Sequence, residues 1–215
     1  MIGINIHLHQ LGKKFGREWI FRQLSTEILA GDKLVILGGN GSGKSTLLQV
    51  ISGFITPNEG AISYVTAAAG APEQNIDNDN VKDYLSLASP YLQLPEDFKA
   101  LELIDHVGHF KPYINKLGSR EVLDLAELSH AGNKYIRQFS SGMKQRLRLA
   151  LAILADAPVL LLDEPVSNLD KKAIQWFTHM INDYAKARTV MVCSNAIEEE
   201  YFFCNKQLQI SDYKI

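Results

Sequence analysis

The stretch Lys33–Ile51 has the sequence KLVILGGNGSGKSTLLQVI and gives the clearest indication of how this chain folds. It begins with a short apolar run, Lys33–Gly38, that ends in glycines, and it continues with a helical pattern through Leu47, Leu48 and Ile51. A strand, a glycine loop and a helix in this order are typical of the opening of a doubly wound α/β core. We therefore predict an α/β fold built on a mostly parallel sheet.

The glycine loop inside this stretch matches the phosphate-binding pattern G-x-x-x-x-G-K-[ST]. The matching residues are Gly38, Gly39, Asn40, Gly41, Ser42, Gly43, Lys44, Ser45 and Thr46. Glycines let backbone N–H groups point at an anion, and the N-terminus of the following helix adds its dipole. Lys44 can reach the β- and γ-phosphates of a nucleoside triphosphate, and the Ser45 hydroxyl can ligate Mg²⁺. The strand before the loop and the helix after it argue against a chance glycine-rich turn, so the pattern indicates a P-loop NTPase core.

Two adjacent carboxylates follow a second apolar run, in the sequence Leu160–Glu164 (LLLDE). They stand at the C-terminal end of a predicted strand, which is where ligands bind in open α/β sheets. Asp163 can hold Mg²⁺ through water, and Glu164 can act as the general base that polarises an attacking water. An acidic strand-to-loop turn is the plainer interpretation, but the phosphate loop favours the catalytic one.

The remaining strands are predicted from alternation and from short apolar runs. Ile4–Leu11 and Trp19–Ile28 alternate, and we expect them to pair as an N-terminal antiparallel β-subdomain. Ala61–Val65 and Leu85–Ser89 are further short strands, and Ala67–Asn80 between them, rich in Ala, Gly, Asn and Asp, is expected to be a loop.

An α-helical subdomain is expected at about residues 97–157, inserted in the P-loop core before the parallel sheet resumes. Its first helix would bury a face made of Leu101, Leu103, Ile104, Val107 and Phe110, and its second would carry Leu123, Leu125 and Leu128. Val159–Leu162 and Thr189–Cys193 are near-continuous apolar runs, as in parallel strands covered on both faces. The helix between them shows apolar residues at helical spacing, which we interpret as core packing. The whole chain, residues 1–215, is predicted to form a single domain.

Composition narrows the classes of protein that this chain can represent. Lys and Arg number 22 against 24 Asp and Glu, for a net charge of −2, so charge gives no argument for a nucleic-acid partner. Cys193 and Cys204 fit no disulfide or metal spacing, and we interpret both as reduced cytosolic residues. No apolar run approaches the roughly 18 residues of a membrane span, so we expect any membrane connection to run through another polypeptide.

Taken together, these motifs resemble the nucleotide-binding subunits of bacterial ABC (ATP-binding cassette) transporters, in the family's order along nearly the whole chain. Phe139–Met143 (FSSGM) resembles the LSGGQ signature, and Ser167–Asp170 (SNLD) resembles the D-loop. Phe15 lies where the family has an aromatic residue that stacks on adenine. Ser140 can also cap the helix that follows it, and Gly142 lets backbone N–H groups approach a phosphate.

The resemblance implies ATP and Mg²⁺ as ligands and a head-to-tail pair of cassettes, expected to be a homodimer. In such a pair Ser140 and Gly142 act in trans on the nucleotide of the opposite subunit, and Asp170 also contributes to the nucleotide site. The resemblance further implies an integral membrane permease as partner and a place on the cytoplasmic face of the inner membrane. On the helix after the signature, we expect Arg146 and Arg148 to form a solvated or dimer-facing stripe.

The chain departs from the family after the run Thr189–Cys193. Family members have a histidine there that contacts the γ-phosphate, whereas this chain has Asn195. An amide can hydrogen-bond a phosphate but carries no proton or positive charge near neutral pH. Either hydrogen bonding suffices at this catalytic position, or hydrolysis is slow while binding is retained.

The second departure concerns the Q-loop, whose glutamine couples Mg²⁺ to the membrane partner in the family. Its spacing from the phosphate-loop lysine points to Tyr91 as the equivalent and hence as a residue near the metal. Gln93 lies close by, and Gln74 is a rival alignment. We prefer Tyr91, because Gln74 comes early and Leu85–Ser89 supplies the strand that should precede this loop.

These observations predict an ATPase subunit that dimerises around two ATP molecules and drives a separate permease. One alternative is a degenerate cassette that binds ATP, hydrolyses it slowly and acts as a regulatory half. Another is a soluble cassette ATPase with no role in transport. Neither the cargo nor the direction of transport follows from these motifs.

Overall fold

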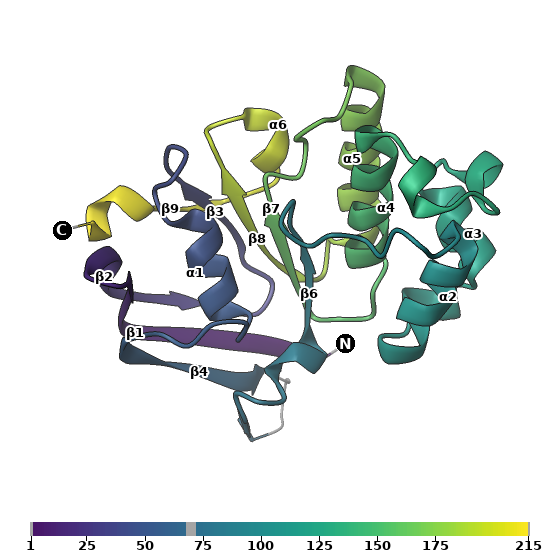
Figure 1. Ribbon diagram of the computed structural model, residues 1–215. Helices are drawn as coiled ribbons and strands as arrows, with labels where there is room; N and C mark the ends of the chain where they lie inside the picture. Colours follow the sequence, from purple (N-terminus) through teal and green to yellow (C-terminus); the bar gives the residue numbers. More distant parts are fainter. Residues whose placement is uncertain (1, 68–71, 215) are drawn as a thin grey trace. The chain divides into compact units, whose positions relative to one another are not determined.

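The computed structural model describes residues 2–67 and 72–214 (Figure 1). The chain forms two compact units. The first unit comprises the chain up to Leu87, then Ala157–Glu164, and the chain from Ala187 onward. The second comprises Ala88–Asp156 and Pro165–Lys186. Part of the predicted loop Ala67–Asn80, residues 68–71, lies outside the described residues.

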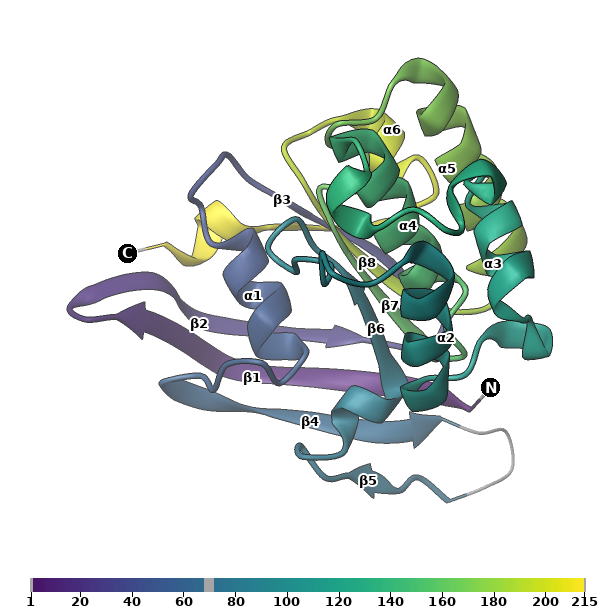
Figure 2. The ribbon, with the colours of Figure 1, turned by 45° about the vertical axis from the view of Figure 1, so that its right-hand side comes forward.

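One sheet of the first unit is antiparallel and has the strand order β2-β1-β4-β5 (Figure 2). Its strands are β1 (Gly3–Phe15), β2 (Glu18–Ile28), β4 (Glu59–Ala67) and β5 (Asn75–Ile76). The prediction of antiparallel pairing near the N-terminus is confirmed, since Ile6 of β1 lies opposite Ile28 of β2. Along β1 buried residues alternate with partly exposed ones, as expected for a sheet with one face on the core.

The other sheet has the strand order β6-β7-β8-β3-β9. Its strands are β3 (Lys33–Leu37), β6 (Leu85–Ala88), β7 (Val159–Asp163), β8 (Thr189–Ser194) and β9 (Lys206–Gln209). β7 pairs with β8, β8 with β3, and β3 with β9, all in parallel. Asp163 lies opposite Cys193, and Leu37 lies opposite Ser194, so β3, β7 and β8 end at the same edge of the sheet. That edge therefore receives the glycine loop, the acidic pair and Asn195.

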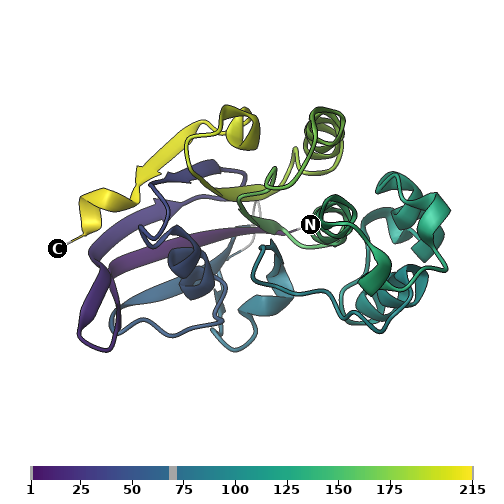
Figure 3. The same ribbon diagram turned by 45° about the horizontal axis from the view of Figure 1, so that its top comes forward.

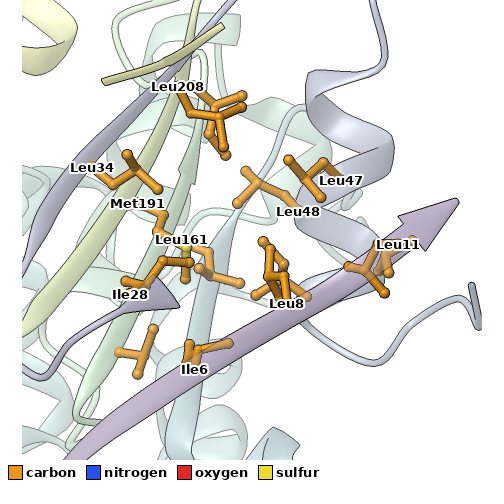
Figure 4. Packing of buried hydrophobic residues seen from close by; sticks show 14 of the residues in the cluster. Ile6, Leu8, Leu11, Ile28, Leu34, Leu47, Leu48, Leu161, Met191 and Leu208 are labelled. Carbon is orange, nitrogen blue, oxygen red and sulfur yellow. The ribbon is translucent and has the colours of Figure 1, made fainter. Parts of the chain in front are cut away.

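The core of the first unit is formed by side chains from both sheets and from helix α1 (Lys44–Ile51). Figure 4 shows Leu8 and Leu11 of β1 near Leu47 and Leu48 of α1, with Leu161 of β7 in the same cluster. The helix that follows the glycine loop is thus fixed by apolar packing, which holds the residues at its N-terminus in place.

The second unit is helical (Figure 3). Its helices are α2 (Ala100–Phe110), α3 (Ser119–Leu125), α4 (Ser141–Ile153) and α5 (Lys171–Tyr184). α4 packs against α3 and α5. The predicted core packing of α5 is confirmed at Phe177, Met180 and Ile181, which are buried, and Trp176 is buried with them. The short helix α6 (Glu198–Tyr201) belongs to the first unit. Within the described ranges, no helix combines the length and apolar character needed to cross a membrane.

Two details of the predicted helical face were wrong. Phe110, expected on the buried face of α2, is 78% exposed, whereas Leu103 and Ile104 are buried. α2 ends at Phe110, where the chain turns away, and the ring packs edge-on against His106 at a centroid distance of 5.1 Å. α3 ends at Leu125, so Leu128 lies outside the helix on which it was expected. Its side chain is nevertheless buried.

Candidate functional site

The glycine loop connects β3 to α1 and has the backbone shape that its sequence predicts. Gly43 adopts a φ of 106°, a conformation that residues with a side chain rarely adopt, and a Cβ there would lie 2.5 Å from Ile20. Ser42 turns its hydroxyl into the loop, where this buried oxygen has no hydrogen-bond partner among the residues that the structure describes. A buried hydroxyl without a partner is costly, and a phosphate oxygen is an acceptor that would satisfy it.

Lys44 is buried, and its ammonium group is surrounded by oxygen atoms. The Nζ atom donates to the carbonyl oxygen of Gly38 at 2.8 Å, to that of Gly39 at 3.0 Å, and to Oδ1 of Asn195 at 2.7 Å. Three acceptors satisfy the three donors of an ammonium group. The positive charge therefore lies at the mouth of the glycine loop, where a phosphate would need it.

The two predicted magnesium ligands meet. Ser45, in the first turn of α1, donates its hydroxyl to Oδ1 of Asp163 at 3.0 Å, and Asp163 is only 2% exposed at the end of β7. The two side chains therefore lie close enough for one Mg²⁺ to be held by the hydroxyl directly and by the carboxylate through a water molecule. Among the described residues no cluster of three or more His, Cys, Asp or Glu could hold a metal ion. A hydroxyl and a single carboxylate suit Mg²⁺, which completes its shell with water and phosphate oxygens.

Glu164 follows β7 with a φ of 47°, in the left-handed region that favours glycine. Its backbone N–H donates to the carbonyl oxygen of Cys193 at 3.0 Å, which ties the residue to the end of β8. The neighbouring Cys193 thiol is no nucleophile, because burial raises its pKa well above the usual value and the charge of Asp163 raises it further. Left-handed backbone at a polar residue is common at functional sites, where the surrounding structure holds it in place.

Asn195 joins the lysine to the glutamate. Its Nδ2 donates to Oε1 of Glu164 at 2.8 Å, while its Oδ1 accepts from Lys44. The amide orientation follows from chemistry, since an ammonium can only donate and a carboxylate can only accept. The sequence predicted a residue near the γ-phosphate here, but it gave no sign that Asn195 bridges two groups that lie 151 and 31 positions away.

Phe15 lies at the end of β1, beside the turn into β2, and is 53% exposed. Lys13 places its ammonium group 5.2 Å from the centre of this ring. An exposed aromatic face with a cation on it suits stacking against a purine base. The remaining loop residues Gly39, Asn40 and Gly41 are exposed, and Thr46 is half-buried.

The signature and D-loop residues line a hollow of about 580 Å³ in the second unit. Ser140 caps α4 as predicted, because its Oγ accepts from the N–H of Met143 at 3.2 Å. A Cβ on Gly142 would lie 3.4 Å from the carbonyl oxygen of Asn168, so the two segments approach closely. Asp170 caps α5 through a bond from Ala173 N–H to its carboxylate at 2.8 Å, a role that its place before a helical pattern could have indicated. The N-termini of two helices thus border one hollow, which favours an anion there.

The expectation that Arg146 and Arg148 form a solvated stripe on α4 was wrong, although Arg146 does line the hollow with Ser140 and Gly142. The Arg146 side chain is only 14% exposed, forms an ion pair with Glu127 at 2.5 Å and lies over the Trp176 ring at 5.5 Å. Arg148 is half-buried, and burial lowers its pKa from the ordinary arginine value. Both guanidinium groups therefore contact other residues of the second unit rather than pointing only into solvent.

The candidates for the Q-loop residue lie in different places. Tyr91 is 72% exposed in the turn after β6, and Gln93 is exposed two residues later. Gln74 belongs to the β4–β5 pairing, where its N–H donates to the Thr66 hydroxyl at 3.1 Å and its carbonyl accepts from the Thr66 N–H. Of the three, only Tyr91 and Gln93 follow a strand of the five-stranded sheet.

Comparisons of sequence and of structure both relate this chain to ABC ATP-binding proteins. A family model described as ABC transporter matches residues 21–167. YdbJ of Bacillus subtilis strain 168, an uncharacterized ABC transporter ATP-binding protein, is 27% identical over 98% of this chain and 67% of its own length. Nod factor export ATP-binding protein I of Rhizobium johnstonii is 28% identical over 94% of this chain and 65% of its own length. The chain spans between about half and two thirds of the length of the curated relatives it matches.

A similar solved structure is that of the ATP-binding cassette MJ0796, determined as a dimer in a post-hydrolysis state with ADP and Pi. It superimposes with a TM-score of 0.78 at 24% identity, and the match covers 98% of this chain and 96% of that one. At this identity the likeness shows a shared fold, a P-loop core with a parallel sheet, an antiparallel sheet and helices.

Proposed function

The chain belongs to the ABC transporter family, and on this premise we propose that it is a subunit that binds and hydrolyses ATP to drive transport. ABC cassettes as a family are ATP-binding, ATP-hydrolysing domains of transporters. The observation that most supports this role here is the meeting of Lys44, the Ser45–Asp163 pair and Glu164 at one edge of the parallel sheet. Carboxyl ends of parallel strands are where nucleotides bind in such sheets.

Each of these residues has a separate task in the proposed reaction. The glycine loop and Lys44 bind the phosphates, and Ser45 and Asp163 would hold Mg²⁺, which neutralises charge on the phosphate oxygens when it is bound. Glu164 accepts a proton from water, the water oxygen bonds to the γ-phosphorus, and the bond from that phosphorus to the bridging oxygen breaks. The products are ADP and phosphate. Asn195, through its bond to Oε1, holds the Glu164 carboxylate in one orientation.

The hollow lined by Ser140, Gly142 and Asp170 supports a second part of the proposal, namely that two cassettes close around ATP. Its two helix N-termini would meet the phosphates of a nucleotide held by the opposite cassette. A similar cassette has been solved as a dimer bound to ADP and Pi, which supports the pairing of two cassettes. We further propose a membrane permease as the partner that responds to closure, with the cassette at the cytoplasmic face of the inner membrane. Both import and export proteins occur among the relatives.

The test is ATP turnover by the full chain and by Glu164→Gln, with Mg²⁺ present. Removing a general base lowers turnover by about 10²- to 10⁴-fold, whereas ATP affinity should change little because the carboxylate does not hold the phosphates. The exposed Glu199 of α6 supplies a matched control, since Glu199→Gln changes charge equally in the same unit. Equal turnover in Glu164→Gln and wild type would remove Glu164 from this role.

A regulatory cassette that binds ATP but hydrolyses it slowly is the second candidate, and Asn195 is the observation that favours it. This amide cannot carry the charge of a histidinium, and it is hydrogen-bonded to both Lys44 and Glu164. Comparing turnover of wild type with Asn195→His separates the two candidates. A large gain in the variant supports the regulatory half, while comparable rates support the hydrolytic subunit.

A further inference from the structure

Two side chains on α4 join segments that are distant in sequence. Gln145 is 3% exposed, and its Nε2 donates to the carbonyl oxygen of Pro165 at 2.9 Å. Arg148, one turn later, donates from Nη1 to Oε1 of the same glutamine. Its Nε donates to the carbonyl oxygen of Leu92 at 3.1 Å. The chain of bonds therefore runs from Leu92 through Arg148 and Gln145 to Pro165.

The chemistry of these groups fixes the direction of every bond. A guanidinium has donors only, so it must face the oxygen of the Gln145 amide and leave the amide nitrogen for Pro165. If Arg148 were absent, the amide could turn over and present its oxygen to the Pro165 carbonyl, which would break the last bond. Arg148 thus controls the rotamer of Gln145, and Gln145 in turn controls the position of the Pro165 carbonyl.

Both ends of this chain are backbone groups in segments without helix or strand. Leu92 directly follows Tyr91, in the turn after β6, and Pro165 directly follows Glu164, whose φ is 47°. The two side chains in the middle of this series of hydrogen bonds are on α4, a helix of 13 residues. Two irregular segments are therefore tied to one rigid element, and one of them continues into the residue proposed as the general base.

We infer that Arg148 and Gln145 are positioning residues for hydrolysis: they tie the backbone at Pro165, the residue directly after Glu164, to helix α4. This inference rests on the proposed role of Glu164. Among the described residues, the hydrogen bonds of these two side chains go to Pro165, to Leu92 and to each other, and none goes to the phosphate loop or to Asp163. Their loss should therefore alter the rate of the chemical step rather than ATP binding. Misplacing a catalytic group by about 1 Å can lower the rate by about 10²-fold.

The experiment compares Arg148→Met, Gln145→Leu and the double variant with wild type and with Arg120→Met, an exposed arginine on α3 that serves as control. ATP turnover, ATP affinity and thermal midpoint are measured for each full-length chain. We expect each single variant to lose about tenfold or more in kcat with ATP affinity within about twofold. The double variant should be no slower than the slower single variant, because members of one chain of bonds are not additive.

A second measurement does not depend on turnover. Amide hydrogen exchange in residues 166–169 should quicken in both Arg148→Met and Gln145→Leu, because each frees the Pro165 carbonyl. Exchange around residues 92–94 should quicken only in Arg148→Met, because Gln145→Leu leaves the bond to Leu92 in place. Arg120→Met should change neither.

The outcomes distinguish a failure of the positioning role from a failure of the proposed ATP hydrolysis. Loss of ATP affinity, additive rate losses, or unchanged exchange at residues 166–169 would each overturn the positioning role. If wild type hydrolyses no ATP, the proposed function fails instead, and the exchange pattern still decides whether the bonds hold Pro165. Arg148→Lys keeps a positively charged hydrogen-bond donor on a single nitrogen. A rate for Arg148→Lys between those of wild type and Arg148→Met would support the role, whereas a rate equal to that of Arg148→Met would contradict it.

Discussion

Replacing Asn195 with alanine removes two hydrogen bonds to charged groups at once. The bonds run from Lys44 Nζ to Oδ1 at 2.7 Å and from Nδ2 to Glu164 Oε1 at 2.8 Å. A hydrogen bond to a charged partner contributes about 1.5–3 kcal/mol, and each 1.36 kcal/mol of transition-state stabilisation is a factor of ten in rate. If the bond to Glu164 aligns the base, Asn195→Ala should lower kcat by about 10- to 150-fold.

The effect on ATP binding should be smaller. Lys44 keeps its two bonds to the carbonyl oxygens of Gly38 and Gly39, so its ammonium group stays at the mouth of the loop. Losing the third acceptor also removes a competitor for the phosphate. We therefore expect KM for ATP to change by less than about threefold while kcat falls.

The assay is phosphate release over a range of ATP concentrations, at several values between pH 6 and 8. In the same series Asn195→His should resemble wild type at pH 8, because neutral imidazole has one donor and one acceptor. At pH 6 it should be slower, because imidazolium cannot accept from Lys44. An unchanged kcat in Asn195→Ala, or a pH-independent rate in Asn195→His, would refute the bridging role.

Three further predictions follow from the same structure. Asp163→Asn should raise the Mg²⁺ concentration at the midpoint of ATP binding by about tenfold or more, measured by titrating Mg²⁺ at fixed ATP. An unchanged midpoint would contradict the role of Asp163 in holding Mg²⁺. Lys33 has its pKa lowered to about 8 by burial and by the charge of Arg188, so the unfolded chain binds more protons above that pH. Chemical unfolding should therefore show wild type gaining stability relative to Lys33→Met between about pH 8 and 10.5, and parallel curves would contradict this. Trp176→Phe loses the bond from Nε1 to the Leu125 carbonyl at 2.7 Å and should cost about 1–2 kcal/mol of unfolding free energy, read as a lower denaturant midpoint.

Much of the fold could be predicted from the sequence, because the deciding signals are local. The alternation in β1 and β2, the apolar runs of β3, β7 and β8, and the glycine loop all depend on neighbours within a few residues. Phe110 shows the limit of such a pattern. A helical face gives the period of burial, but where the helix ends and what covers its last turn are set by tertiary packing.

The site was only partly predictable for the same reason. The residues predicted to bind ATP and magnesium belong to short motifs, so each was found singly, and only the structure shows that the Ser45 hydroxyl meets the Asp163 carboxylate. The bridge at Asn195 and the chain of bonds through Arg148 join residues that are dozens of positions apart. We expected a solvated or dimer-facing arginine stripe on α4, and only the packing around it shows that Arg148 is hydrogen-bonded within the second unit.

The most direct test of the central claim measures the mass of the Glu164→Gln chain in solution with Mg²⁺ and ATP. The claim is that one nucleotide is held by the phosphate loop of one cassette and by the Ser140–Gly142 hollow of another. With hydrolysis blocked, ATP should convert the variant into a stable dimer, and Ser140→Arg added to it should abolish the dimer by filling the hollow. A chain that binds ATP under these conditions and remains monomeric would show that the hollow holds no nucleotide of a second cassette.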